Sequence, residues 1–243
     1  NNTTDVFVFD RDTDTTERVS IATDGSESLL YCMDPDISAD GRYVAFESRG
    51  SALVPGDTNL SFDVFVHDRQ AGTTERVSVA TSGVEADDDS VAAAISGDGS
   101  TVVFRSNADN LVPGIESDES QIYARNIASG TTRCISLSTR GFPGNGRCYG
   151  GAVSNDGGVV AFGSDASNLV GGDTNHSRDV FVVGTGGGEA GGGLRLTVTS
   201  DPVAGGHVNP TAKNVNSGDA VTVEAVPAAG YHFRRWAVVA SAG

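Results

Sequence analysis

Short runs in which hydrophobic and polar positions alternate, or in which β-branched and aromatic residues cluster, recur along this chain. Tyr43-Val44-Ala45-Phe46 and Asp63-Val64-Phe65-Val66 are typical, and each is bounded by Asp, Gly or Thr. The dipeptide Asp40-Gly41 before the first run favours a hairpin turn, because glycine readily adopts a positive φ. No stretch shows the 3.6-residue spacing of a helix. The sequence therefore predicts an all-β fold.

The pattern repeats with a period of 58 residues. The run beginning at Asp5 recurs at Asp63, in altered form at Gln121, and again at Asp179. The turn sequences keep the same step: Ser38-Ala39-Asp40-Gly41, Ser96-Gly97-Asp98-Gly99 and Ser154-Asn155-Asp156-Gly157. A fixed period over several cycles indicates stacked copies of one unit, and each period contains four strand-like runs. Four strands per repeat is typical of a β-propeller blade.

The motif Ser-x-Asp-Gly-Arg-Tyr-Val-Ala-Phe is followed by Asp-Val-Phe-Val-x-Asp-Arg and by Thr-Thr-Glu-Arg-Val-Ser. Together these residues resemble the TolB-type β-propeller repeats of bacterial envelope and secreted proteins. The resemblance covers residues 1–183 and implies a propeller fold. It does not imply one function, because such blades occur in binding scaffolds, protease-associated domains and enzymes.

The number of strands does not fill a comfortable closed ring. Two runs (5–10 and 15–21) precede two full blades at 35–80 and 93–138, and the unit at 152–183 has only three runs. Propellers typically have four to eight blades. We expect an incomplete ring with blades missing upstream. Otherwise the first two strands would pair with the unit at 152–183 or with a second chain, because unpaired edges promote self-association.

The pattern changes after residue 183. Residues 184–193 are a glycine-rich linker by composition, and residues 194–243 form a separate small β module. Its closing Gly230-Tyr231-x-Phe233-x-x-Trp236 resembles the divergent internalin B-type repeat of bacterial surface proteins. That resemblance implies that the three aromatic residues form the core of a spacer or anchor module.

Charge narrows the choice of partners. The formal net charge of −16 would repel nucleic acid and anionic membrane surfaces. No run reaches the roughly 20 apolar residues of a membrane span, so no membrane insertion is expected. The Asp- and Gly-rich composition is compatible with a cation-rich setting outside the cell. We expect an extracellular or cell-envelope location in a bacterium.

One repeated set of polar residues is not demanded by the fold. It stands before a strand in two copies: Asp57, Asn59 and Asp63, and Asp173, Asn175 and Asp179. In the copy at 115–121 all three are lost together, which suggests that they act as one unit. Oxygen-bearing side chains at this spacing predict calcium sites, although calcium needs six to eight ligands. The alternative is turn chemistry, because Asp and Asn also cap turns.

The chain has three cysteines, Cys32, Cys134 and Cys148. Cys32 and Cys148 occupy the same place in different repeats, and only one repeat holds two cysteines. We expect a Cys134–Cys148 disulfide, worth roughly 3 kcal/mol if it is unstrained. The alternative is three buried thiols. The spacing does not fit a zinc site.

No residue set predicts catalysis. The sequence contains neither Gly-x-Ser-x-Gly nor His-Glu-x-x-His nor a phosphate loop. Asp68-Arg69 and Glu75-Arg76 are expected to form cross-strand ion pairs within one blade. The sequence thus favours a calcium-stabilised, non-enzymatic scaffold that binds a protein or a glycan. The alternative is a polysaccharide-active propeller enzyme, a hydrolase or a lyase, with clustered carboxylates in its channel.

Overall fold

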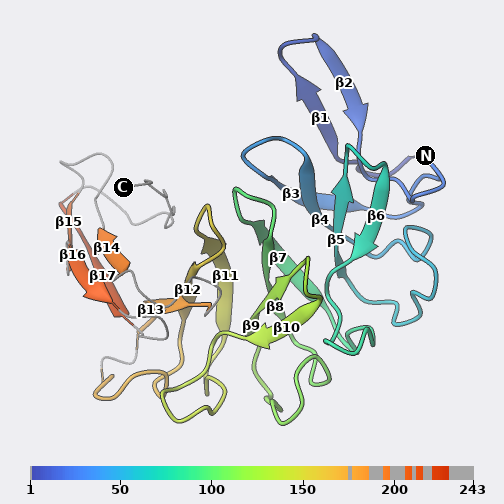
Figure 1. Ribbon diagram of the computed structural model, residues 1–243. Helices are drawn as coiled ribbons and strands as arrows, with labels where there is room; N and C mark the ends of the chain where they lie inside the picture. The colour runs from blue at the N-terminus through green and yellow to red at the C-terminus, as the bar shows by residue number, and fades with distance from the viewer. Residues whose placement is uncertain are drawn as a thin grey trace.

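The computed structural model describes residues 2–174, 177–185, 194–197, 206–209, 212–215 and 221–229. All regular structure in these ranges is β, and the strands form antiparallel sheets (Figure 1). The predicted all-β class is confirmed. None of the described residues forms a helix long and apolar enough to span a membrane.

Two complete four-stranded sheets follow each other along the chain. The first consists of β3 (Cys32–Ile37), β4 (Tyr43–Ser48), β5 (Asp63–Asp68) and β6 (Thr73–Arg76). The second consists of β7 (Ser90–Ile95), β8 (Thr101–Ser106), β9 (Gln121–Asn126) and β10 (Thr131–Cys134). In both, neighbouring strands pair in chain order. The predicted four-stranded unit is therefore present, with strand bounds close to those expected.

The predicted hairpin turns form as the sequence indicates. Gly41 has a φ of 72°. The Ser38 hydroxyl donates to Asp40 Oδ1 at 2.6 Å and accepts from the Tyr43 backbone N–H at 2.9 Å. The same contacts recur at Ser96-Asp98 and Ser154-Asp156. This serine-aspartate pair closes the turn between the first and second strand of each sheet.

The core lies between successive sheets. Separate hydrophobic clusters fill the space between the first hairpin and the first sheet, between the two complete sheets, and beyond the second one. The two complete sheets and the last unit each contain one stacked aromatic pair, with ring centroids 5.6–5.9 Å apart: Phe46–Phe65, Phe104–Tyr123 and Phe162–Phe181. Strand β7 contacts the first strands of both neighbouring sheets, β3 and β11, so the sheets converge along that side.

The first and last units differ from the complete sheets. The hairpin of β1 (Phe7–Asp10) and β2 (Thr15–Arg18) projects beyond the first complete sheet (Figure 1). The last unit joins β11 (Cys148–Val153), β12 (Val159–Ser164) and β13 (Asp179–Gly184) to β17 (Val221–Pro227) and β15 (Gly206–Asn209). A separate pair is formed by β14 (Leu194–Thr197) and β16 (Ala212–Val215).

Pairing between β13 and β17 corrects one expectation. The sequence left the unit at 152–183 without a fourth strand and offered the N-terminal strands as a possible partner. Instead β17 lies antiparallel to β13, with Val180 opposite Val223 and Val182 opposite Val221. The alternative that the N-terminal strands complete this unit was wrong, because the edge of β13 is taken by a strand from residues 221–227, later in the chain. The boundaries 1–183, 184–193 and 194–243 stay predictions, since much of that region lies outside the described residues.

Candidate functional site

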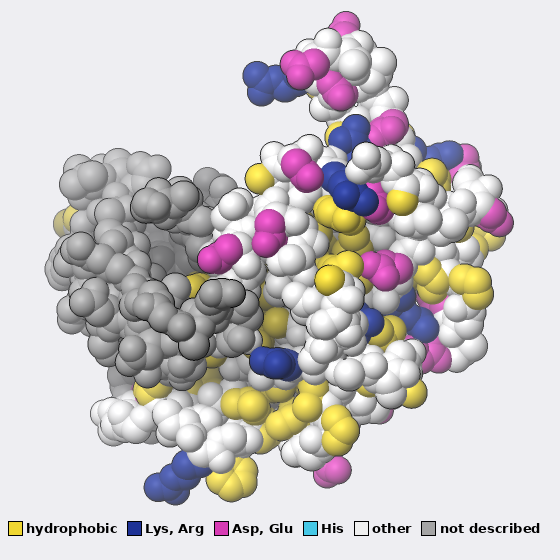
Figure 2. Space-filling view, in the orientation of Figure 1, with side chains coloured by type: hydrophobic (Ala, Val, Ile, Leu, Met, Phe, Trp, Pro, Cys, Tyr) yellow, Lys and Arg dark blue, Asp and Glu magenta, His cyan; other side chains and the backbone are white. Residues whose placement is uncertain are grey.

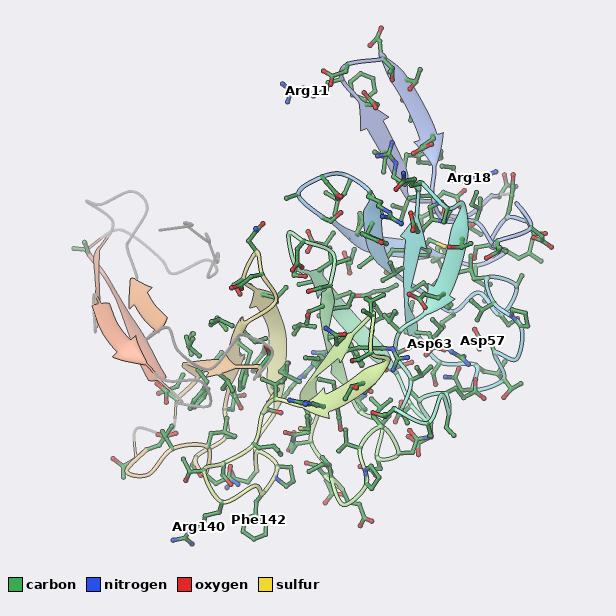
Figure 3. The ribbon with its side chains drawn as sticks, viewed as in Figure 1. Arg11, Arg18, Asp57, Asp63, Arg140 and Phe142 are labelled. Atoms are coloured by element: carbon green, nitrogen blue, oxygen red, sulfur yellow. The ribbon has the colours of Figure 1, made fainter. Side chains whose placement is uncertain are left out.

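Asp57, Asn59 and Asp63, the first predicted set of cation ligands, come together in the structure. Asp63 opens β5 and is fully buried. The Asn59 amide donates from Nδ2 to Asp63 Oδ2 at 3.0 Å and to the Ala86 carbonyl at 2.8 Å. Figure 3 shows Asp57 and Asp63 at the same side of the sheet. The loop before β5 is therefore anchored by these side chains, as both the metal hypothesis and the turn hypothesis require.

The positive charge among them comes from Arg76 at the end of β6. Its Nη1 lies 3.3 Å from Asp57 Oδ1, 3.1 Å from Asp63 Oδ2 and 2.8 Å from Glu85 Oε2. The arginine side chain is 9% exposed, so this network is mostly shielded from water. Sequence reasoning placed Arg76 in a cross-strand ion pair and missed this role. The repeat carried the signal, because the arginine is absent from the same copy that lacks the acids.

Burial sets the electrostatics of this network. Desolvation raises the pKa of the Asp63 carboxyl, against the Ser78 hydroxyl and the Arg76 guanidinium, which both lower it. Burial also raises the pKa of Asp57, and the neighbouring Asp63 charge adds to that effect. Three carboxylates thus share one guanidinium, whose Nε has no hydrogen-bond partner among the described residues. Such a network is costly to break, because most of its members are shielded from water.

The N-terminal hairpin carries a related network. Arg18 lies 3.4 Å from Asp5 and also pairs with Glu27. The Ser20 hydroxyl donates to Asp5 Oδ1 at 2.9 Å. These residues stand 58 positions before Arg76, Asp63, Glu85 and Ser78. An arginine that pairs with acids beside a serine hydroxyl therefore occurs at the same positions in two of the repeat units.

The second predicted set is only partly described. Asp173 and Asp179 lie within the described residues, and Asn175 lies outside them. In this unit β17 lies beside β13, in the position that β6 has beside β5. Thr222 of β17 is opposite Phe181, as Arg76 of β6 is opposite Phe65. Among the described residues no group of three or more His, Cys, Asp or Glu is placed to hold a metal ion. Calcium at these loops stays a prediction.

The three cysteines are free, buried thiols in this structure. The expected Cys134–Cys148 disulfide is therefore not formed in it. Burial raises the pKa of Cys134 to about 12, which disfavours the reactive thiolate. Cys148 Sγ lies 3.4 Å from the Ser164 hydroxyl, as Cys32 Sγ does from Ser48. In the intervening sheet a serine pair takes the same place.

A buried acid near the converging first strands was not singled out from the sequence. Glu47 on β4 is 3% exposed, and its carboxylate accepts a hydrogen bond from the backbone N–H of Ala92 in the next sheet. Burial raises the pKa of Glu47 to about 6, and the charge of nearby Asp34 adds to that. Asp34 and Ala92 both sit at β-bulges with positive φ, 49° and 56°. A comparison of the repeats could have singled out Glu47, because the other copies have Arg105 and Gly163 at this position.

A hollow of about 330 Å³ lies beside an exposed turn between β10 and β11. It is lined by Ser138, Thr139, Arg140, Phe142, Asn168, Val170 and Gly171. The Ser138 backbone N–H donates to the Phe142 carbonyl, and the Phe142 N–H donates to the Ser138 hydroxyl. The Gly141 N–H donates to the Ser138 carbonyl, and Gly141 has a φ of 82°. Phe142 is 64% exposed and projects with Arg140 from the lower edge of the molecule (Figure 3).

Comparison with known proteins found one matching family model and a set of similar solved structures. Residues 196–242 match the family model of the divergent InlB B-repeat domain. Among solved structures, the chain is similar to TolB from Acinetobacter baumannii (15% identity, TM-score 0.43), over 89% of this chain and 47% of that one. It is also similar to a putative TolB from Agrobacterium tumefaciens (16%, 0.45), over 86% and 69% of the two chains. A third is the β-propeller domain of the Trilobed protease from Pyrococcus furiosus, whose topology is open velcro (12%, 0.39; 64% and 39%). A search of curated proteins found no match.

Proposed function

We propose that this protein is a secreted or surface-exposed bacterial scaffold that binds a protein or a glycan. The turn bearing Arg140 and Phe142 carries this proposal. The equivalent turns of the earlier units hold Ser82 with Val84 and Asp24 with Ser26, so the arginine-aromatic pair is unique to one unit. Residues that the repeat does not require are free to serve binding. Arginine and aromatic residues also dominate the energetics of binding sites.

The turn is suited to binding because it is already ordered. The hydrogen bonds between Ser138 and Phe142 order the backbone that carries the two side chains before a ligand arrives, which lowers the entropy cost of association. The hollow beside them offers room for a side chain or a sugar ring. Arg140 also places a positive charge on a protein of net charge −16, which favours a ligand that is acidic at this point.

A glycan array and a panel of extracellular-matrix proteins, probed with the intact protein, test this proposal. The double variant Arg140→Ala/Phe142→Ala should weaken binding of any ligand found by at least tenfold. The matched control, Ser82→Ala/Val84→Ala, alters the equivalent turn of the preceding unit and should leave binding unchanged. Equal losses in both variants would place the ligand elsewhere.

An enzyme acting on polysaccharide is the second candidate. Glu47 supports it, because a carboxyl with a raised pKa beside a second acid, Asp34, is the kind of pair that glycoside hydrolysis uses. Its burial and its hydrogen bond to Ala92 support a structural role instead. A reducing-end assay on bound glycans separates the two. Release of new ends that is lost in Glu47→Gln would establish catalysis.

The predicted calcium belongs to this proposal as a stabiliser. Calcium bound by the loop before β13, and by the loop before β5 only where it displaces Arg76, would hold these loops without taking part in ligand recognition. The support is the repeated Asp-x-Asn spacing and, in the first loop, the convergence of its acids. At that loop calcium would have to displace Arg76.

A further inference from the structure

Two arginines of the last unit lie over the same aromatic ring. The guanidinium carbon of Arg178 is 3.3 Å from the ring centroid of Tyr149, and that of Arg147 is 5.5 Å from it. Tyr149 lies on β11, Arg147 directly before that strand and Arg178 directly before β13. Two segments that are distant in sequence therefore bring their positive charges to one side chain.

One acid partly balances these two charges. Asp165, directly after β12, accepts from Arg178 Nε at 3.2 Å through Oδ1 and from the Tyr149 hydroxyl at 2.7 Å through Oδ2. Both oxygens of Asp165 are thus engaged, and Arg147 forms no ion pair with any of the described residues. The group of Arg147, Tyr149, Asp165 and Arg178, called the Tyr149 cluster below, carries one positive charge in excess.

The first complete sheet shows a balanced version of this arrangement. Arg49, directly after β4, lies 4.6 Å from the ring centroid of Phe62 and pairs with Asp89 at 3.4 Å. One arginine there meets one acid, so no charge is left over. The Tyr149 cluster is not set by the repeat, because the other units carry different residues at its four positions: Tyr31 and Asp89, Met33 and Val91, Arg49 and Asn107, Phe62 and Ser120.

Both arginines are accessible to a ligand. The side chain of Arg178 is 54% exposed, and Arg147 is exposed as well. The terminal nitrogens of Arg178 and the side chain of Arg147 make no hydrogen bond with the described residues. A guanidinium that stacks on an aromatic ring keeps its N–H donors free for a further partner. The cluster therefore offers two forked sets of donors that are already held in place.

The excess of one charge fits a ligand group with a single negative charge. A carboxylate matches the fork of a guanidinium, and the contacts of Asp165 show that this cluster binds one. A polyanion is disfavoured, because the net charge is −16 and acidic side chains are spread over the visible face of the molecule (Figure 2). The best ligand is therefore one carboxylate on a body that is otherwise neutral.

Neutral polar side chains lie beside the cluster. The Asn145 amide donates from Nδ2 to Ser167 Oγ at 3.2 Å, and the Asp165 backbone N–H donates to the Arg147 carbonyl at 3.0 Å. The loops at 145–147 and 165–167 therefore lie side by side, and neither of these two described loops holds an exposed large hydrophobic residue. Amide and hydroxyl groups both donate and accept, so they suit the hydroxyls of a sugar better than an apolar peptide side chain.

We propose that the Tyr149 cluster binds the carboxylate of an acidic sugar in an otherwise neutral glycan. The carboxylate accepts hydrogen bonds from Arg147 and from the terminal nitrogens of Arg178, which makes the site electrically neutral. Asn145 and Ser167, beside the cluster, meet the hydroxyls of the sugar. These residues differ from those of the Arg140–Phe142 turn, so the site does not depend on the function proposed for that turn.

An NMR titration of the intact protein with methyl glucuronide tests this site, and methyl glucoside is the neutral counterpart. We expect saturable shifts of arginine Nε–H signals with the acidic sugar and at least about tenfold weaker binding of the neutral one, because charge-assisted hydrogen bonds are lost. Arg147→Gln and Arg178→Gln should each weaken binding of methyl glucuronide about tenfold for the same reason. Asp165→Asn should instead tighten binding, because it raises the excess positive charge of the cluster.

Arg49→Gln is the matched control, since Arg49 also lies over a ring but is balanced by Asp89, and binding should not change. Asp14→Asn removes the same charge as Asp165→Asn from the N-terminal hairpin and should also leave binding unchanged. Melting curves show whether each variant is folded. The pair of Arg178 and Asp165 is 54% and 43% exposed, so its loss should cost little stability.

Three results would overturn the proposal. The first is absence of binding, or equal binding of methyl glucuronide and methyl glucoside. The second is full binding in both Arg147→Gln and Arg178→Gln. The third is equal or tighter binding of acetate, or of an acetylated dipeptide with a free C-terminal carboxylate, because the site would then not select a sugar.

Discussion

The two complete sheets differ in how they satisfy the buried polar side chain at the start of their third strand. In the sheet β3–β6 the start of the third strand carries Asp63, which is held by Arg76. In the sheet β7–β10 the same positions hold Gln121 and Cys134, both neutral and buried. There the Gln121 side chain accepts from the Ser136 hydroxyl at 2.7 Å and donates to the Gly144 carbonyl at 2.9 Å. One sheet satisfies its buried groups with charges, and the other with neutral hydrogen bonds.

The difference shows that the network changes as a unit. Both sheets keep a serine at the same position, Ser78 and Ser136. The Ser78 hydroxyl accepts a hydrogen bond from the Val64 backbone N–H, and the Ser136 hydroxyl accepts one from the Ile122 backbone N–H. The acid and the arginine disappear together, because either one alone would leave a buried charge without a partner. Joint loss of the acids in one repeat was the sequence argument for a metal. A lost arginine explains the same pattern.

The largest effect should come from removing the charge that holds the first network together. Arg76→Ala leaves Asp57 and Asp63 buried without their cation, and should lower the free energy of unfolding by about 3–5 kcal/mol. Arg49→Ala is the control. Its pairing with Asp89 joins side chains that are 48% and 33% exposed, so its loss should stay below about 1 kcal/mol. Urea denaturation measures both, and equal losses would refute the account.

Replacing Asp63 and Arg76 by the residues of the second sheet should recover part of the unfolding free energy that the single variants lose. In Asp63→Gln/Arg76→Cys the two positions take the residues of the second sheet, and no acid is left unpaired at position 63. The double variant should lose about 1–3 kcal/mol less than the sum of the two single variants. Asp63→Gln combined with Arg49→Ala serves as the reference and should be additive. Additivity in both combinations would mean that Asp63 and Arg76 are not coupled.

The sequence was a good guide to the strands and a weaker one to the side-chain networks. The step of 58 residues and the Asp40-Gly41 turn were enough to predict four strands per sheet. Strand spacing is a local property, so it is visible in a single repeat. The position of Arg76 near Asp57 depends on how the loop before β5 folds back onto the end of β6, which spacing does not reveal. Pairing of β17 with β13 joins segments that stand on either side of a glycine-rich stretch of sequence, and no periodicity connects them.

Glu47 should make the free energy of unfolding depend on pH through the first complete sheet. The equivalent residue in the second sheet is Arg105, so only the first sheet buries an acid here. A carboxyl whose pKa rises from 4.5 to about 6 on folding binds its proton more tightly in the folded state. Its stabilising contribution is complete below pH 4.5 and is lost as the pH rises to about 6, at a cost of about 2 kcal/mol.

Glu47→Gln should therefore be more stable than the original protein above pH 6, by up to that amount, and the gap should close below pH 4.5. The glutamine side chain in this variant retains an oxygen that can accept from the Ala92 N–H. Unfolding in urea across this range measures the gap. Asp40→Asn is a suitable control, because hydrogen bonds from Ser38 and Arg42 lower the pKa of Asp40, and its titration falls outside the window. A pH-independent difference for Glu47→Gln would contradict the assignment.

The smallest expected effect separates the two predicted calcium loops. At the loop before β5 the guanidinium of Arg76 already lies among the acids. At the loop before β13 the neighbouring strand is β17, which is not the repeat's own fourth strand and has Thr222 at the position of Arg76. We expect calcium to raise the melting temperature by several degrees relative to chelator, by mass action on the folded state. Asp173→Asn should reduce that difference, and Asp57→Asn should preserve it. Identical melting curves with calcium and with chelator would instead leave both loops to turn chemistry, with Arg76 as the cation of the first.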